Sequence, residues 1–244
     1  MPTHTLLEIT EKCQFACPIC DSRFGPDGKH LPLAQIENVL NRFAKDAPTT
    51  ILKITGGEPT IHPDIERILA TVRALPFDRI ILDTNGLRIS QDDEFVRRLM
   101  DFTPSLELHL QFDSLRPSVL QELRGEDLSD LRRRALFRLN KLNAPTLLTV
   151  AVKKGINDRE IGSVIEFAKQ QPCVKGILLH PIKLLARTVT ADAGFPAMNC
   201  ADLYIILEQL AGYSGPEPAN CDQLELRFAD NSIHGISLKR ISGS

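Results

Sequence analysis

The stretch LELHLQFD, from Leu106 to Asp113, decides between the two folds that the rest of the sequence permits. These are a sheet that closes partway into a barrel and an open wound sheet. Polar and apolar residues alternate strictly along it, so Glu107, His109 and Gln111 share one face of a strand. A strand covered on both faces should instead be almost continuously apolar. The alternation predicts a polar face shielded from bulk solvent, as in a barrel lumen that holds a polar ligand. An edge strand with a wet face is the alternative.

Around this stretch, short apolar runs alternate with segments of helical period, which is typical of βα units on a parallel sheet. The predicted strands are 6–10, 51–55, 79–83, 106–113, 146–152 and 174–180. Apolar stripes predict helices between them, one of them after Pro63 and one opened by Ser90, while Asn157 and Glu160 resemble a capping box. The predicted fold is α/β, a partial (βα)6 TIM-like barrel.

The C-terminal part of the chain has a different pattern. The punctuation SGPEP at 214–218 is followed by two alternating stretches, 224–228 and 233–238, on either side of Asp230-Asn231. We expect a barrel over residues 1–212, and a linker with a small β-hairpin extension over 213–244.

Composition excludes several classes of protein. The 244 residues carry a net charge of -2, which gives no global attraction to nucleic acid. No apolar run is long enough to span a bilayer, and residues 1–10 carry no leader pattern, so we expect a cytoplasmic protein. The run Arg132-Arg133-Arg134 is interpreted as a solvated helix face.

The loop after the first predicted strand holds three closely spaced cysteines. Cys13, Cys17 and Cys20 stand in EKCQFACPIC, at gaps of three residues and then two. Three thiolates can hold three corners of an iron-sulfur cube and leave the fourth iron open to a ligand. Structural zinc is the main alternative, although its sites usually draw on a second cysteine pair, and no such pair is visible here.

This Cys-x3-Cys-x2-Cys spacing resembles the radical S-adenosylmethionine (SAM) superfamily. The motif GGEP, at Gly56, Gly57, Glu58 and Pro59, follows the second strand, where that family binds the amino group of SAM. Its glycines allow close backbone approach, and Glu58 supplies a carboxylate for an ammonium. The resemblance covers about residues 5 to 182. It implies a [4Fe-4S] cluster on Cys13, Cys17 and Cys20.

The resemblance also implies further contacts to SAM. Ile19 matches a position that packs on adenine, and Gln111 and Asp113 stand where relatives often show Ser-x-Asp toward the ribose, a pattern from which Gln111 departs. Arg124 resembles an arginine near the SAM carboxylate. Other cofactor contacts are expected at Asn157, Leu178, His180 and Pro181.

The chemistry that the resemblance implies is reductive cleavage of SAM to a 5′-deoxyadenosyl radical, which abstracts hydrogen from a substrate C–H bond. An electron donor such as flavodoxin or ferredoxin is expected. Within the superfamily, the sequence is most similar to the branch with the pterin methylase and the tetraether-lipid synthase, whose members are longer. The substrate is expected to be a small molecule, a lipid or a peptide. An activase that places a radical on another protein is the alternative, and a non-catalytic zinc module is more remote.

The remaining cysteines, Cys173, Cys200 and Cys221, are expected not to form a second cluster, because strand six and the following helix separate them along the barrel. The long segment 183–199 is expected to cover the substrate. His109, Arg187 and Cys200 are the candidate substrate contacts.

Overall fold

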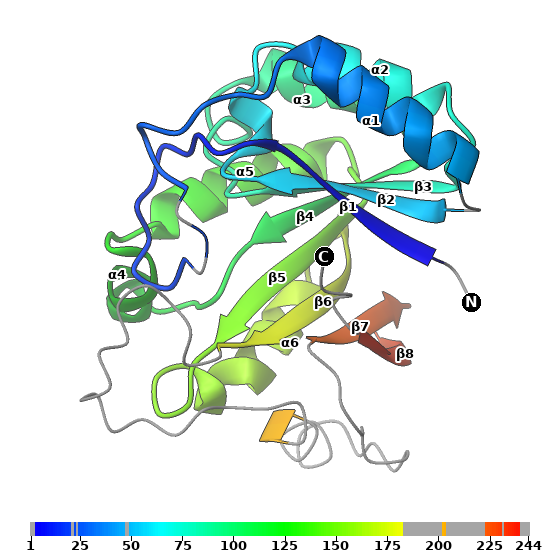
Figure 1. The fold of residues 1–244 in the computed structure, drawn as a ribbon. Coiled ribbons are helices and arrows are strands. Elements are labelled where there is room, and N and C mark those ends of the chain that lie inside the picture. Colours follow the sequence, from blue (N-terminus) through cyan, green and yellow to red (C-terminus); the bar gives the residue numbers. More distant parts are fainter. Residues whose placement is uncertain are drawn as a thin grey trace. The chain divides into compact units, whose positions relative to one another are not determined.

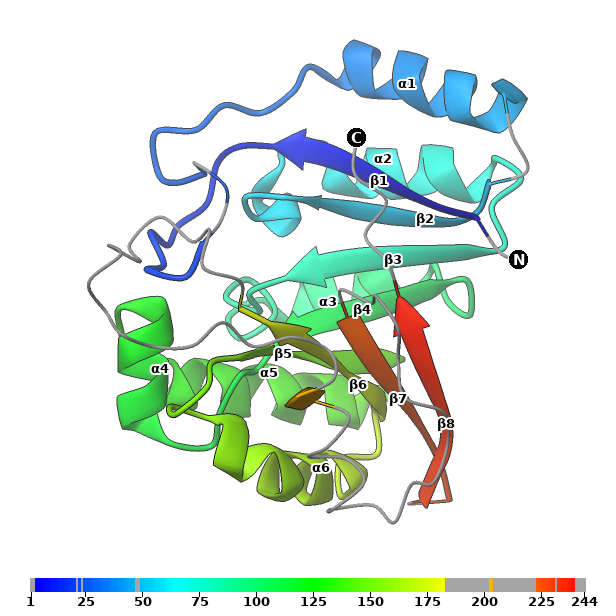
Figure 2. The same ribbon diagram turned by 60° about the horizontal axis from the view of Figure 1, so that its bottom comes forward.

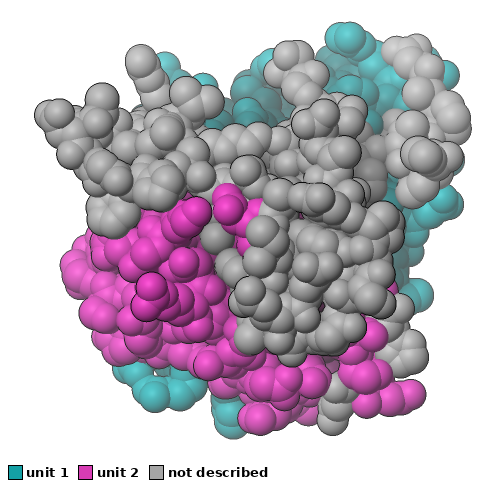
Figure 3. Space-filling model, turned by 90° about the horizontal axis from the view of Figure 1, so that it is seen from below, with its two compact units in different colours: residues 1–16, 22–110, 130–146 teal, residues 17–21, 111–129, 147–244 magenta. Residues whose placement is uncertain are grey.

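The structure is a computed structural model, and it describes residues 3–20, 22, 24–46, 49–182, 202–203, 223–230 and 232–239. Strands and helices alternate along the chain, and hydrogen bonding orders the described strands β1 to β8 as they occur in the sequence. The chain divides into two compact units (Figure 3). The first comprises residues 1–16, 22–110 and 130–146, and the second comprises 17–21, 111–129 and 147–244.

The first unit carries four parallel strands. They are β1 (Thr3–Thr10), β2 (Thr49–Gly56), β3 (Arg79–Thr84) and β4 (Leu106–Gln111), and each pairs in parallel with the next. All four strands were predicted within a few residues. Because parallel strands place their carboxyl ends at one edge of a sheet, the segments after β1, β2 and β3 meet there.

Helices α1 (Leu33–Asp46) and α2 (Ile65–Arg73) run along one face of β1 and β2, and α3 (Asp93–Met100) and α5 (Ser129–Lys141) complete the unit (Figure 1). The apolar side chains of the strands face these helices, which leaves the polar ones on the opposite face. The core residues, each at most 1% exposed, include Ile36, Leu40, Leu52, Ile54, Ile68, Leu69, Val72, Leu82, Phe95, Leu99 and Leu110.

The second unit places α6 beside β5 and β6, followed by an antiparallel hairpin of β7 and β8 (Figure 2). The predicted terminal hairpin is thus confirmed, whereas the domain boundary at residue 212 stays a prediction. The elements of this unit are α4 (Pro117–Arg124), β5 (Thr146–Val152), the 3₁₀ turn η2 (Asp158–Glu160), α6 (Ile161–Lys169), β6 (Val174–Pro181), β7 (Gln223–Ala229) and β8 (Ser232–Lys239).

Two helix starts differ from the prediction. The cap of α3 is Asp92, whose side chain accepts a hydrogen bond from the Phe95 amide, whereas the Ser90 hydroxyl donates to the Leu87 carbonyl. Helix α2 begins at Ile65 and not at Pro63. Both helices thus begin two or three residues later than the sequence pattern suggests.

The interpretation of Arg132 as a solvated residue is wrong. Arg132 is buried on α5, while Arg133 beside it is exposed. The buried stripe of α5 includes Leu131, Ala135 and Leu136, so position 132 lies within that stripe by helical period. Within the described residues, no helix is both long and apolar enough to cross a membrane.

Candidate active site

The polar face of β4 is buried, as its alternation predicts. Glu107 and His109 are 7% and 1% exposed. The strand is not an edge strand, because β3 pairs with one side of it and the Leu108 amide donates to Pro145 O (2.9 Å) on the other. His109 Nε2 lies 3.0 Å from Glu107 Oε1, and Glu107 also pairs with Arg79.

Asp83 on β3 extends this polar face. It pairs with Lys53 Nζ (2.8 Å) and accepts from the Thr55 hydroxyl (3.1 Å), both on β2. Its Oδ1 lies 3.6 Å from His109 Nδ1. Asp83 was not predicted to belong to this face, because it lies in the mostly apolar run of β3. Its polar partners come from strands that are distant in sequence.

The carboxylate of Glu58 accepts four hydrogen bonds in the first unit. It is 1% exposed and caps the short 3₁₀ turn η1 (Pro59–Ile61). Oε1 accepts from the Thr60 amide (3.2 Å), the Thr60 hydroxyl and the Thr84 hydroxyl (2.7 Å), and Oε2 accepts from the Asn85 amide (2.7 Å). Burial raises the pKa of Glu58, and these donors oppose the rise. Each carboxylate oxygen offers about two lone pairs, and Oε2 accepts one hydrogen bond here, so Oε2 retains capacity for a ligand donor.

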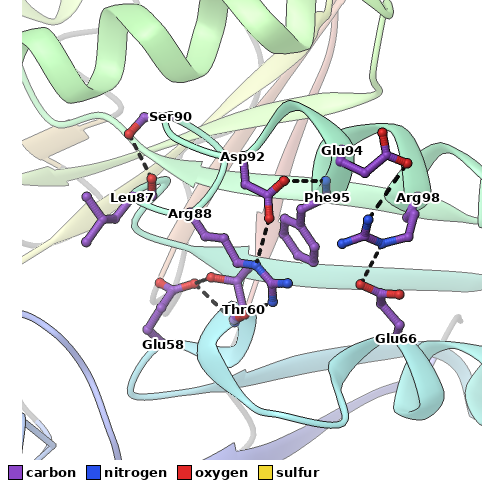
Figure 4. A network of polar contacts seen from close by, with 10 residues as sticks. All are labelled: Glu58, Thr60, Glu66, Leu87, Arg88, Ser90, Asp92, Glu94, Phe95 and Arg98. Atoms are coloured by element: carbon purple, nitrogen blue, oxygen red, sulfur yellow. Dashed lines mark hydrogen bonds and ion pairs between the residues drawn. The ribbon is translucent and has the colours of Figure 1, made fainter.

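The support of this carboxylate extends to α3. Arg88 donates to the Thr60 carbonyl (2.6 Å), and its guanidinium stacks 3.7 Å from the centre of the Phe95 ring (Figure 4). Asp92 lies beside Arg88 in the same view. The turn that carries Glu58 is therefore held by its own strand, by the end of β3 and by α3.

The two glycines of GGEP hold the turn against the chain that enters the cysteine loop. Gly56 has φ +127°, which side chains rarely adopt, and a Cβ on Gly57 would lie 2.3 Å from Lys12 O. The Gly57 amide donates to Thr10 O (2.7 Å) and the Glu58 amide to Lys12 O (2.8 Å). The GGEP turn and the start of the cysteine loop are therefore one hydrogen-bonded structure.

Asn85 joins Glu58 to the first cysteine. Its amide nitrogen Nδ2 lies 3.8 Å from Cys13 Sγ and 3.2 Å from Gln14 Oε1, while its backbone donates to Glu58. Thr84 and Asn85 were not predicted as site residues from the sequence. The available signal was the polar Thr-Asn-Gly at the end of the third strand, at the sheet edge where the other motifs also lie.

In the second unit, the cysteine segment, residues 17–20, lies against the C-terminal end of α4. The Ile19 amide donates to Leu123 O (3.4 Å), and the Cys20 amide donates to Cys17 O (3.1 Å). Gly125 ends α4 at φ +88°, in the left-handed conformation that glycine adopts without strain. Cys17 and Ile19 therefore lie next to the last turn of this helix.

Asp113 and Arg124 form a buried ion pair beside Cys17. Arg124 Nε and Nη2 lie 2.9 Å from Asp113 Oδ2 and Oδ1, and Asp113 Oδ1 also accepts from the Ala151 amide (3.0 Å). Asp113 is fully buried at φ +64°, an uncommon conformation for a residue other than glycine. Burial raises the pKa of the Cys17 thiol, whereas the Arg124 guanidinium lowers it.

The capping box predicted at Asn157 is wrong. Its side chain makes no cap hydrogen bond, because Nδ2 donates to Asp113 O (3.1 Å) and Ala151 O (2.8 Å), and Oδ1 accepts from the Lys153 amide (2.8 Å). Asn157 thus ties the end of β5 to Asp113, and its predicted contact to SAM stays a prediction.

The other predicted site residues are distributed as follows. Gln111 is the last residue of β4, and Leu178, His180 and Pro181 lie in the second half of β6. Cys173 is buried and lies directly before β6. Arg187, Cys200 and Cys221 lie outside the described residues.

The three loop cysteines suit an iron-sulfur cluster in their chemistry. All three are reduced thiols and partly exposed, whereas Cys173 is buried. Asn85 Nδ2 donates to Cys13 Sγ and the positive charge of Arg124 lies beside Cys17, and both favour negative charge on sulfur. Within the described residues, no three His, Cys, Asp or Glu side chains converge on one metal ion. A cube does not require such convergence, because each thiolate binds a different iron.

Comparison with known proteins agrees with these motifs. The family model described as the Radical SAM superfamily matches residues 7–168. The 7,8-dihydro-6-hydroxymethylpterin dimethyltransferase of Methanocaldococcus jannaschii is 25% identical over 186 residues, which cover 74% of this chain and 36% of that protein. A probable GTP 3′,8-cyclase of Thermococcus kodakarensis is 28% identical over 196 residues, covering 79% of this chain and 60% of that protein. This chain thus spans less than two thirds of the length of these relatives.

Among solved structures, Streptococcus suis SuiB bound to S-adenosylmethionine matches with a TM-score of 0.68 and 18% identity. The match covers 86% of this chain and 47% of that one. At this identity the match concerns the fold, and it confirms the predicted partial barrel with its C-terminal hairpin.

Proposed function

Because the chain belongs to the radical SAM superfamily, whose enzymes use a [4Fe-4S] cluster and SAM, we propose that Cys13, Cys17 and Cys20 hold the cluster for the reductive cleavage of SAM. Together these cofactors supply a 5′-deoxyadenosyl radical that takes a hydrogen atom from a substrate C–H bond. An external reductant such as a ferredoxin or flavodoxin provides the electron. The observation that carries the proposal is Asn85, which contacts both Cys13 and Glu58 and so links the cysteine loop to the GGEP turn.

Each part of the site has a proposed role toward SAM. Glu58 Oε2 binds the methionine ammonium through its remaining lone pair. The backbone of Gly56 and Gly57 lets the ligand approach closely. Ile19 packs on adenine, and Asp113 is directed to the ribose. Further cofactor contacts are proposed for Pro59, Gln111, Asn157, Leu178, His180 and Pro181.

We propose a small molecule as the substrate. The curated relatives above are named for a pterin and for GTP, and both pterin and the guanine base of GTP are fused nitrogen heterocycles. A structure of SuiB with its precursor peptide also matches, but at 19% identity it supports the fold alone. The polar face with buried His109 and partly exposed Asp83 provides hydrogen-bonding groups for a polar ligand.

Anaerobic reconstitution tests the proposal. The protein should bind about four iron and four sulfide ions per chain. Changing Cys13, Cys17 and Cys20 together to Ala should abolish this binding, while Cys173→Ala, which alters a cysteine outside the loop, should keep it. The loaded protein with a reductant and SAM should release 5′-deoxyadenosine.

A triple variant that retains its iron and sulfide would refute the assignment of the ligands. About eight iron ions per chain, with about four surviving in the triple variant, would refute the single cluster as well.

A further inference from the structure

The guanidinium of Arg124 faces two partners at once. Its Nε and Nη2 each lie 2.9 Å from one Asp113 oxygen, so the planar fork of the arginine is bound at both prongs. Arginine carries five N–H donors, and this pairing uses two of them. The guanidinium also lies beside the Cys17 thiol and lowers its pKa. Arg124 is therefore fixed between a carboxylate and a cysteine thiol.

The local fold leaves Arg124 little freedom to turn away. Its side chain is 10% exposed, and that of Asp113 is fully buried. Asp113 is in turn held by the Ala151 amide and through its own carbonyl by Asn157. Since the cysteine segment hydrogen-bonds to the last turn of α4, Arg124 and Cys17 are held close together.

The sign of the electrostatic effect follows from these positions. A cluster gains one negative charge when it is reduced, so a nearby fixed cation favours the reduced form and raises the reduction potential. Arg124 supplies that cation, and burial limits its screening by salt. Asp113 opposes the effect, but it acts on Cys17 across the guanidinium and so from a greater distance.

We propose that Arg124 is a positioning residue that raises the reduction potential of the cluster through its positive charge beside Cys17, and that Asp113 orients Arg124 and attenuates its charge. The inference rests on the proposed function, because Cys17 must ligate the cluster. It differs from the role suggested by the family resemblance, in which Arg124 contacts the SAM carboxylate.

The midpoint potential of the reconstituted cluster, measured without SAM by a dye-mediated titration followed by electron paramagnetic resonance, tests the proposal. Arg124→Gln should lower the potential by about 59 mV, which is a tenfold loss in the preference for reduction. Asp113→Asn leaves the arginine charge unopposed and should raise the potential. General damage to the site does not produce opposite shifts from the two partners.

Arg116→Gln is the matched control. Arg116 precedes α4 at its other end and pairs with Glu160 (3.1 Å), and its side chain is 53% exposed. The substitution also removes one positive charge, at the N-terminal end of α4, about 12 Å along the helix from Arg124. Its potential should stay close to that of the wild type.

Either single variant can lose its fold, because it leaves a buried charge without its partner. The double variant Asp113→Asn/Arg124→Gln keeps hydrogen-bonding groups at both positions and removes both charges. Its potential should lie below that of the wild type, because the lost cation is the nearer of the two charges to Cys17.

Equal potentials in the wild type and the double variant would overturn the inference, as would shifts of the same sign in both single variants. Unmoved potentials with weakened binding of SAM in Arg124→Gln would assign the arginine to the SAM carboxylate instead. These results would leave the proposed function intact. Iron that survives loss of Cys13, Cys17 and Cys20 would overturn both.

Discussion

Glu58→Gln tests the proposed role of the GGEP carboxylate. The change keeps the size of the side chain and removes its charge. In the wild-type protein, Oε1 accepts three hydrogen bonds and Oε2 accepts one, from the Asn85 amide. An incoming methionine ammonium would complete the set at Oε2. In the variant, an NH₂ group replaces one of these oxygens and repels donors where it stands.

The magnitude follows from the bond that is lost. A hydrogen bond to a charged group contributes about 1.5 to 3 kcal/mol, so the dissociation constant of SAM should rise about ten- to a hundredfold. The amide also leaves at least one buried donor without an acceptor, which should lower the free energy of unfolding by about 1 to 3 kcal/mol.

Isothermal titration calorimetry with SAM on the anaerobically reconstituted protein measures the first effect, and urea denaturation measures the second. Iron content should stay at the wild-type level. Glu66→Gln is the control, because Glu66 is a partly exposed carboxylate on α2 that pairs with Arg98 (2.9 Å; Figure 4). An unchanged affinity for SAM in Glu58→Gln, with a folded protein, would show that GGEP serves only as a turn.

Two further predictions concern the scaffold. Asp92→Ala removes the cap of α3 and should cost about 0.5 to 2 kcal/mol of unfolding free energy in urea at neutral pH. The Phe95 amide lowers the pKa of Asp92, so this difference should be full above about pH 4 and shrink as pH falls through the folded value; a difference that persists in acid would contradict the reasoning. Gly57→Ala forces a Cβ against Lys12 O and should reduce iron loading, whereas Gly25→Ala, with nothing within 4 Å, should not. Equal loading in both glycine variants would separate the GGEP turn from the cysteine loop.

The sequence was sufficient for features that repeat with a period. The apolar runs placed the strands of the barrel, and the alternation from Leu106 onward predicted a polar face that is buried. The cysteine spacing and GGEP are local patterns, so their positions at strand ends followed from the strand predictions.

Side-chain pairing across strands was not predictable. Glu58 is satisfied by Thr84 and Asn85, which lie 26 and 27 residues away in sequence and approach it only because β3 pairs with β2. The same reason accounts for Asn157, which has the sequence pattern of a cap and instead bonds the carbonyl of Asp113. The local helix-capping preference of the asparagine is outweighed here by hydrogen bonds that only the folded sheet makes possible.

The bonding of Glu58 has a consequence for protein engineering. A designer who moved the four residues GGEP onto another βα scaffold would transfer a buried carboxylate without most of its donors, since the Thr84 hydroxyl and the Asn85 amide come from the neighbouring strand end. Such a graft would expel the side chain into solvent or protonate it. The smallest transplantable module is therefore two adjacent strand ends, with Thr-Asn-Gly carried alongside GGEP.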